Sequence, residues 1–575
     1  MPAGTLGGVE LTRPAPAAEK GPLDDTFYDL VEARFRDRVE RDPVSATYLG
    51  IHAWDDQLGD PSRDAALEEI ESDRHHLAAI EALDTAALSS EARFERDLEL
   101  HHLRLSLFNG DVVRSWERHA TGASAVGDAL FPLFARDHAP LNERLEAIAG
   151  RLEGVPAYLA AHRTRAVQPQ VRVWQEVELT ASRDLPGFLD EIIAAADGLS
   201  ATAHRRLLQG ADGARIAVSE QADWIRGTLA AGTGAWPLQR ERYDELVGLR
   251  AFGGLDSDAI LAIGWDQLER NHADRAAAAR EIDASATEAD VIDRVKSDHP
   301  ATFEGALEGY RTAMNRARRH LIEHDLVTVP ADERVEVIET PAYLRGVLPF
   351  AAYYAPAKWD TGAVGLYVVT PSVDGDPGAM REHYRAAISN TSLHEAYPGH
   401  HLQLAIGARH PSLSRLQVDA PEFVEGWGMY SEQMMREEGF DDGPEFRLAL
   451  ATDAIWRACR IILDVRMHRG EVSIEEATDF LVEHTGFERP NAAAEARRYT
   501  STPTYVLSYL LGKVLILGLR DEERRRLGSE FSLRAFHDAL LWSGSLPITF
   551  QRRALHGEGR AVARGPAASR AAARP

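Results

Sequence analysis

Residues 392–401 read Ser-Leu-His-Glu-Ala-Tyr-Pro-Gly-His-His, and the chemistry of the protein is best placed in this stretch. It places three imidazoles and one carboxylate within eight residues: His394, Glu395, His400 and His401. Adjacent histidines at 75–76 and 101–102 lack a preceding His-Glu pair, and we expect them at the surface or in packing contacts. The stretch therefore predicts a site for a divalent transition metal that activates water, if a further ligand lies elsewhere in the chain.

A regular helix cannot bring these histidines to one ion. In the His-Glu-x-x-His pattern of zinc hydrolases the second imidazole follows four residues after the first, but that position here is Pro398. His401 would lie on nearly the same face as His394 but ~10.5 Å further along the axis, and His400 would be turned by about 240°. Zinc–nitrogen bonds of about 2.0 to 2.1 Å do not span such a gap.

The Pro398-Gly399 pair predicts a break that removes this obstacle. Proline lacks an N–H and crowds the carbonyl four residues before it, and glycine adopts conformations closed to other residues. The helix, expected from about residue 377 to 401, should kink or bulge there. The break favours His400 as the second ligand, with His401 as the alternative.

A separate helix is expected to supply the third ligand. The run Pro-Glu-Phe-Val-Glu-Gly-Trp-Gly at 421–428 has proline at a first helical position and two glycines that let another helix approach closely. Glu425 is the predicted ligand. Glu422 is the alternative, although an acid in the first turn also compensates the helix dipole.

The rest of the chain is predicted to be mainly α-helical. Helical spacing of apolar residues begins at Asp24, and the N-terminal half, to about residue 326, has such stretches at 65–83, 91–108, 141–162, 185–208, 216–231 and 257–282. Three short runs with strand character predict a small sheet just before the metal-binding helix, at 334–339, 350–355 and 365–370. Helices resume at 421–437, 445–468, 473–485, 490–498 and 506–518.

These patterns predict a single domain over residues 23–550, with its metal-site part at 327–550. Residues 1–22 are rich in Pro, Gly and Ala and are expected to form a flexible leader. Residues 551–575 are rich in Ala, Arg and Gly and are expected to form a disordered basic tail.

Charge and composition restrict the classes of partner. The 64 basic and 90 acidic side chains give a net charge of −26, which disfavours binding to nucleic acid or an anionic membrane. The single cysteine, Cys459, cannot form an intrachain disulfide and is expected to be a buried thiol. No signal peptide or apolar run of bilayer length is visible, so a cytoplasmic protein is expected. The sequence does not indicate an oligomeric state.

The segment from His394 to Gln403 resembles the HExxPGHH signature of the DUF885 family, bacterial proteins grouped with the zincin-type metallopeptidases. The similarity covers about residues 25 to 545. The family's N-terminal element corresponds to residues 42–56 and its second acidic helix to residues 425–427. A D-x-x-x-H pair corresponds to Asp464 with His468, and an RY…PGQALSYKxG segment to residues 498–512. One departure is Pro503-Thr504-Tyr505-Val506 in place of PGQA, so substrate contacts around Tyr505 are expected to differ.

The resemblance implies a zincin-like helical body around a deep cleft, similar to the carboxypeptidase and dipeptidyl-carboxypeptidase branch of the gluzincins, and hence a carboxypeptidase- or dipeptidase-like enzyme. The expected chemistry is zinc-dependent hydrolysis of a peptide or amide bond, with one catalytic Zn²⁺ on His394, His400 and Glu425. Glu395 is expected to take a proton from water and to pass it to the leaving amine.

Further roles are predicted for side chains near this site. Tyr509, Tyr505 and His468 are candidate donors to the oxyanion, and each has an alternative as a packed aromatic or a core histidine. Arg498 is a candidate for binding a substrate carboxylate, with a structural ion pair as the alternative. The run 365–370, with Tyr367, is predicted to be an edge strand that pairs with an extended peptide.

Two other functions remain open from sequence. The same ligand set suits a metal-dependent hydrolase or lyase acting on a small amino-acid derivative. It also suits a non-catalytic helical binding protein in which the metal only stabilises the fold.

Overall fold

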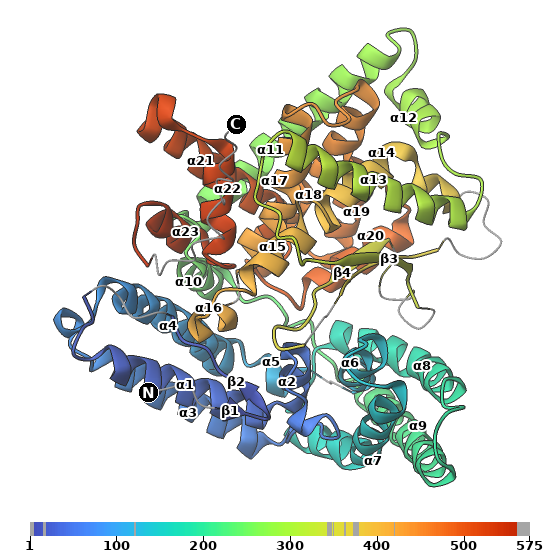
Figure 1. The fold of residues 1–575 in the computed structure, drawn as a ribbon. Coiled ribbons are helices and arrows are strands. Elements are labelled where there is room, and N and C mark those ends of the chain that lie inside the picture. The colour runs from blue at the N-terminus through green and yellow to red at the C-terminus, as the bar shows by residue number, and fades with distance from the viewer. Residues whose placement is uncertain are drawn as a thin grey trace, which may run out of the picture.

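The structure, a computed structural model, describes residues 5–14, 19–119, 122–341, 345, 348, 350–360, 364–371, 379–418 and 420–559. It is mainly helical, as predicted, with one two-stranded and one three-stranded sheet in the described chain (Figure 1). None of the helices in these residues combines the length and apolar character needed to cross a membrane.

The N-terminal half forms the lower part of the molecule in Figure 1, where the chain runs from blue to teal. A first group of helices packs around apolar side chains of α1 and α4, and a second group packs around α7 and α9. Their bounds are α1 Asp24–Arg41, α2 Pro43–Leu49, α3 Arg63–Glu81, α4 Ser90–Phe108, α5 Ser115–Arg118, α6 Ala123–Ala135, α7 Leu141–Arg165, α8 Arg172–Ala194 and α9 Ala201–Leu229.

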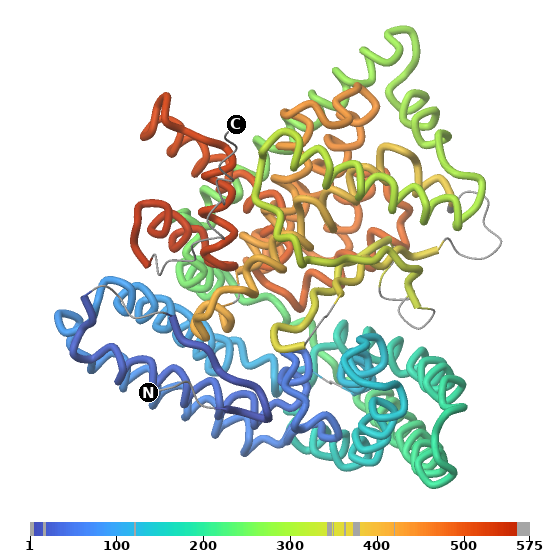
Figure 2. Tube along the Cα trace, in the orientation of Figure 1, coloured from blue at the N-terminus to red at the C-terminus, as the bar shows by residue number. Residues whose placement is uncertain are grey.

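The remaining helices form the upper part, except the short α16 (Leu413–Gln417), which packs on α1 and α4, and Figure 2 traces the chain's path. Two large clusters of buried apolar side chains lie there, one around α11 and α18 and the other around α13, α17 and α21. The bounds are α10 Arg240–Arg250, α11 Ser257–Ile282, α12 Glu288–Lys296, α13 Phe303–Glu323, α14 Arg385–Glu395, α15 His400–Gly407, α16 Leu413–Gln417, α17 Pro421–Glu437, α18 Pro444–His468, α19 Ile474–Thr485, α20 Arg489–Tyr499, α21 Ser508–Leu527, α22 Leu533–Trp542 and α23 Ile548–Leu555.

The three predicted strands are confirmed, but their order corrects the expectation for residues 365–370. The strands β3 Val335–Glu339, β4 Ala351–Tyr354 and β5 Gly365–Val369 are arranged in the order β3-β5-β4. β5 pairs in parallel with β3 and antiparallel with β4. Because both sides of β5 already have partners, it is the central strand and the prediction of an edge strand there was wrong. The edges are β3 and β4.

Two further expectations are corrected. Part of the segment expected to be a flexible leader packs on the body, because Thr5–Leu6 (β1) pairs with Val9–Glu10 (β2) and Leu11 is fully buried. The stretch predicted as one helix at 185–208 is divided between α8 and α9, since the Ser200 side chain accepts a hydrogen bond from the backbone N–H of Ala203 and caps a new helix.

The C-terminal boundary of the folded part also lies later in the chain than expected. Residues 551–559, expected to begin the disordered tail, include the last turns of α23, and the Gly559 carbonyl accepts a hydrogen bond from Arg415. Residues 560–575 lie outside the described residues, as does the start of the helix expected from residue 377. Cys459 is a buried free thiol, as predicted, and burial raises its pKa to about 12.

Candidate metal centre

The helix that carries His394 breaks where Pro398-Gly399 predicts it. Helix α14 ends at Glu395 and α15 begins at His400. Between them, the backbone N–H of Gly399 donates to the carbonyl of Leu393 at 3.0 Å and turns the chain back on itself. A Cβ on Gly399 would lie 1.8 Å from the His394 carbonyl oxygen, so only glycine fits this close approach.

The break brings His394 and His400 together with Glu425. The two imidazole rings are 4.6 Å apart between centroids and nearly perpendicular. Glu425 Oε2 lies 3.7 Å from His394 Nε2 and 3.4 Å from His400 Nε2, and one ligand atom from each residue lies within 4.8 Å of the others. Ligand atoms of a tetrahedral zinc ion are about 3.3 to 3.4 Å apart, given bonds of about 2.0 to 2.1 Å. The three side chains therefore fit one such ion with small adjustments.

His401 faces away from this group, as predicted. Its Nδ1 pairs with the Tyr353 hydroxyl at 2.9 Å and its Nε2 with Glu333 Oε2 at 2.6 Å. Glu333 also accepts hydrogen bonds from Tyr397 and Arg318. With both ring nitrogens occupied, His401 anchors the turn to β4 and to the segment before β3, and it is not placed as a ligand.

Helix α17 presents Glu425 to the histidines through two close helix contacts. A Cβ on Gly426 would lie 2.5 to 2.8 Å from backbone atoms of Gly512 and Lys513, which marks the closest approach of α21. A Cβ on Gly428 would lie 2.6 to 2.9 Å from the His394 ring, so this glycine leaves room for the imidazole. Glu422, the alternative ligand, is buried in the first turn of α17 and is absent from the ligand group.

Glu432 belongs to the candidate site, and the sequence interpretation missed it. Its Oε1 lies 2.7 Å from His394 Nδ1, which leaves Nε2 for a metal, and carboxylates commonly orient zinc-bound imidazoles in this way. The available signal was its position seven residues after Glu425, two turns along the same face of α17. Asn390, one turn before His394, donates to Glu432 at 2.9 Å and to Asp453 at 2.8 Å.

The carboxylates determine the protonation of this group. Burial disfavours a charged imidazole, but Glu425 and Glu432 outweigh it and raise the pKa of His394 to about 10. Burial likewise opposes ionisation of Glu425, yet the two histidines hold its pKa well below the usual range. A metal that takes His394 as a ligand must therefore displace a proton.

Tyr505 and Tyr509 lie beside the ligand carboxylate. The Tyr505 hydroxyl donates to Glu425 Oε1 at 3.0 Å, and the two tyrosine rings are 6.1 Å apart at 85°. Burial, followed by the charge of Glu425, raises the pKa of both phenols, to about 12 for Tyr509. Both hydroxyls therefore stay protonated at neutral pH and remain hydrogen-bond donors.

Glu395 follows His394 at the end of α14 and is half-buried. No described residue donates a hydrogen bond to its carboxylate, in contrast to Glu425 and Glu432. Its negative charge reaches Tyr310 and Tyr367, contributing to the raised pKa of each after burial. Glu395 is thus an available carboxylate next to a ligand.

The structure does not bring the other predicted residues to this group. His468 is fully buried, its Nε2 is 3.0 Å from the Tyr499 carbonyl and its ring stacks on Tyr243, so it has the core position named as its alternative. Arg498 forms an ion pair with Glu495 at 2.9 Å, also the alternative for that residue. Tyr367 is fully buried on the central strand and packs edge-on against Tyr310, which excludes contact with an extended peptide.

A second group of possible ligands, His52, Asp55 and His138, has the wrong ring geometry. The two imidazoles stack in parallel, 3.9 Å apart with 4° between their planes, so their in-plane lone pairs do not converge. His52 instead bridges Asp55 and Asp360, at 2.8 Å each. It links the N-terminal half to the segment after β4, and these carboxylates outweigh burial and raise the pKa of His52 to about 9.

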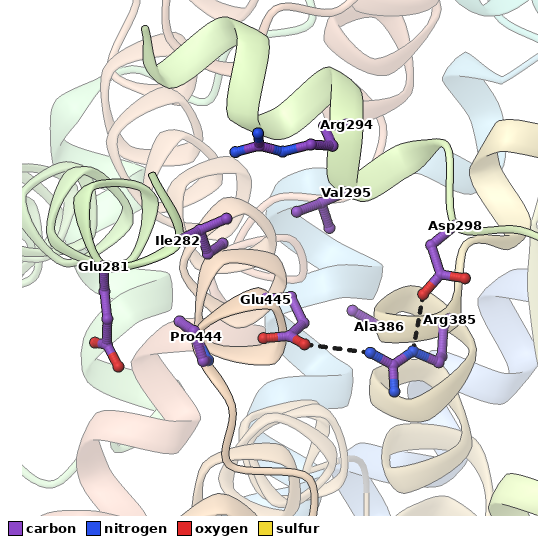
Figure 3. A pocket seen from close by; sticks show the side chains of 9 residues that line it. All are labelled: Glu281, Ile282, Arg294, Val295, Asp298, Arg385, Ala386, Pro444 and Glu445. Atoms are coloured by element: carbon purple, nitrogen blue, oxygen red, sulfur yellow. Dashed lines mark hydrogen bonds and ion pairs between the residues drawn. The ribbon is translucent and has the colours of Figure 1, made fainter. Parts of the chain in front are cut away.

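A pocket of about 360 Å³ lies at the opposite end of α14 (Figure 3). Its lining includes Arg385, roughly 14 Å from His394 along the helix axis at 1.5 Å per residue. Arg385 pairs there with Asp298 at 2.9 Å and Glu445 at 3.2 Å. We assign the chemistry to the ligand group and not to this pocket, whose arginine is already neutralised.

Comparison with known proteins identifies the family. The sequence profile described as "Bacterial protein of unknown function (DUF885)" matches residues 43–555. The chain belongs to the DUF885 family. No curated protein shows significant sequence similarity to this DUF885 chain.

Two solved structures share the fold of this DUF885 chain. One is a candidate lipoprotein of unknown function from Shewanella oneidensis, with a TM-score of 0.76, 22% identity, and coverage of 92% of this chain and 99% of the other. The second is a candidate lipoprotein from Colwellia psychrerythraea, with a TM-score of 0.78, 18% identity, and coverage of 93% and 98%. At these identities the likeness supports the fold alone.

Proposed function

We propose that this DUF885 protein is a metal-dependent hydrolase of peptide or amide bonds, related in its chemistry to the zincin metallopeptidases. The observation that carries the proposal is the convergence of His394 and His400, from the two sides of a broken helix, with Glu425 from α17, and with Glu395 next to a proposed ligand. Two imidazoles and one carboxylate form the ligand set of many catalytic zinc sites.

His394, His400 and Glu425 would hold the metal, and Glu432 would fix the His394 ring through Nδ1. A bound Zn²⁺ supplies Lewis acidity, polarising both a water molecule and the substrate carbonyl. Zinc is the metal proposed because two nitrogens and one carboxylate oxygen at tetrahedral spacing match its preferences.

Glu395 acts as the general base and then as the general acid. Its carboxylate is free of hydrogen bonds from described residues, so it can take the proton of the attacking water. The same proton then goes to the leaving amine. Tyr505 and Tyr509 present protonated hydroxyls next to Glu425, where they can donate to the negative charge that develops on the carbonyl oxygen.

Activity and metal content measured together test this proposal. The protein is loaded with zinc, its zinc is counted by elemental analysis, and hydrolysis of a pool of N-acetylated tetrapeptides is followed by mass spectrometry. Glu395→Gln is expected to keep one zinc per chain and to lose hydrolysis by about 10²-fold or more. Glu336→Gln, an exposed carboxylate on β3, is the matched control and should retain activity. Full activity in Glu395→Gln would rule out the mechanism.

A further inference from the structure

A chain of polar contacts leads from His394 of the candidate metal centre to α18. His394 pairs with Glu432 at 2.7 Å, and Asn390 joins Glu432 to Asp453. Asp453 in turn lies 3.6 Å from Nη1 of Arg457, one helical turn further along α18. Arg457 is close enough for its charge to help lower the pKa of Glu432, after His394 and against burial.

A second series of contacts connects the same stretch of α18 to Glu425. The guanidinium of Arg457 lies 4.1 Å from the centre of the Trp456 ring, and that of Arg460 lies 4.0 Å from it. Arg460 also lies over Tyr509 at 4.8 Å, and Tyr509 packs against Tyr505, which binds the ligand carboxylate. The contacts thus form a closed circuit that passes through His394 and Glu425 of the candidate metal centre, and both arginines belong to it.

The two arginines differ in whether their guanidinium N–H groups donate hydrogen bonds to described residues. Arg460 is almost fully buried and donates to Tyr499 at 3.2 Å and to Glu495 at 3.1 Å. Arg457 keeps 18% of its side chain exposed, and no described residue accepts a hydrogen bond from its guanidinium. Its Nη1 is buried without a hydrogen-bond partner among the described residues, and Asp453 at 3.6 Å is beyond hydrogen-bond range.

Charge around the centre explains what such a free guanidinium can bind. The circuit contains Glu425, Glu432 and Asp453, and Glu395 lies beside His394, in a chain of net charge −26, so an anionic substrate is repelled unless a cation receives it. The Arg457 guanidinium lies over the Trp456 ring, and none of its N–H groups donates a hydrogen bond to a described residue. That planar fork matches a carboxylate in two-point geometry.

We propose that Arg457 binds the C-terminal carboxylate of the substrate, so that the enzyme prefers peptides with a free C-terminus close to the cleaved bond. This inference rests on the proposed function, since the carboxylate belongs to the molecule that is hydrolysed. It makes Arg457, and not Arg498, the determinant of substrate class.

The first test compares hydrolysis of two N-acetylated tetrapeptide pools, one with free and one with amidated C-termini. Wild type should favour the free pool. Arg457→Gln should lower kcat/KM for the free pool about 10- to 100-fold, mainly through KM, and leave the amidated pool almost unchanged. Arg457→Lys keeps the charge without the fork, so it should show a smaller loss with the same selectivity. Arg447→Gln is the control, because Arg447 lies on the same helix as Arg457 and loses only an exposed ion pair with Glu281 of α11.

Several outcomes would overturn the inference. They are equal hydrolysis of both pools by wild type, an equal loss on both pools in Arg457→Gln at unchanged zinc content, and an Arg457-dependent preference for Asp- or Glu-containing members of the amidated pool. The last result would assign the arginine to a side-chain carboxylate. If Arg457→Gln fails to fold, the selectivity of Arg457→Lys decides.

A binding measurement separates this inference from the proposed hydrolysis. Zinc-loaded Glu395→Gln, with and without Arg457→Gln, is dialysed to equilibrium against the same pools, and retained peptides are counted by mass spectrometry. If wild type hydrolyses neither pool, the proposed function fails, but Arg457-dependent retention of the free pool still supports the carboxylate site. Retention of neither pool, or of both equally, contradicts it.

Discussion

The indole of Trp427 donates a hydrogen bond to the carbonyl of Pro398 at 2.8 Å. Trp427 lies two residues after Glu425 on α17 and is fully buried, whereas Pro398 lies in the turn between the two histidines proposed as ligands. A single buried contact therefore fixes the turn that positions His400 against the helix that carries the third ligand.

Trp427→Phe removes this hydrogen bond and keeps most of the aromatic bulk. Because the freed carbonyl stays buried and the turn loses its tie to α17, we expect zinc affinity to fall about 10-fold and the free energy of unfolding to fall by about 1 to 3 kcal/mol. Competition with a chelator of known affinity measures the former, and urea unfolding the latter. Trp359→Phe, which loses an indole bond to the Glu10 carbonyl far from the ligands, should leave zinc affinity unchanged; equal losses in both variants would contradict the prediction.

His400→Ala and His401→Ala should have opposite effects. His400→Ala removes a ligand, so stoichiometric zinc should be lost on elemental analysis while the fold is retained. His401→Ala leaves the Glu333 side chain, which is 1% exposed, with fewer partners and should cost about 1 to 3 kcal/mol of stability, with zinc still bound. Loss of zinc only in His401→Ala would reverse the ligand assignment.

The two tyrosines should be separable by metal affinity. Tyr509→Phe removes a donor without touching a ligand, so kcat should fall by about 10²- to 10³-fold at full zinc occupancy. Tyr505→Phe also removes the hydrogen bond to Glu425, so both kcat and zinc affinity should change. Tyr48→Phe, whose hydroxyl reaches only the backbone of Asp128 among described residues, serves as the control. An unchanged kcat in both site variants would remove the tyrosines from the mechanism.

His52 should stabilise the fold in a pH-dependent way. Its pKa is raised from 6.5 to about 9 by Asp360 and Asp55 against burial, so its contribution is fully present below about pH 6.5 and is lost as the pH rises through 9. His52→Gln should cost about 1 to 2 kcal/mol in urea unfolding at pH 6, because water screens a side chain that is 30% exposed. The difference from wild type should shrink above pH 9. His75→Gln, an exposed histidine, should show no such trend; a difference that stays constant with pH would contradict the ionic account.

Much of the candidate site follows from local covalent geometry. Pro398 and Gly399 forbid a continuous helix, and the fixed rise and turn of a helix then decide which histidine can meet His394. The limits of α17 and the three short strands also follow from nearby residues, through proline positions and apolar periodicity. These predictions need no knowledge of how distant segments pack.

The parts that could not be predicted depend on tertiary pairing. The central place of β5 is set by which neighbours dock on each side, which the alternation of its own residues does not encode. His468 has the same residue type as a ligand, yet Trp236 and Tyr243 enclose it in the core. Arg457 was overlooked because its free donors become visible only once Asp453 and Trp456 are in place around it.

The proposed ligands and the other side chains of the contact circuit come from two different sets of elements. The proposed ligands come from α14, α15 and α17, whereas the guanidinium and phenol groups come from α18, α21 and the turn before α21. On the proposed function, substitutions of Arg457 on α18 would change which molecules are accepted and leave the proposed ligands in place, whereas Tyr505 is hydrogen-bonded to Glu425 and affects both. Substrate preference and metal binding would then depend on different helices, so that a substitution on α18 would change the first without the second.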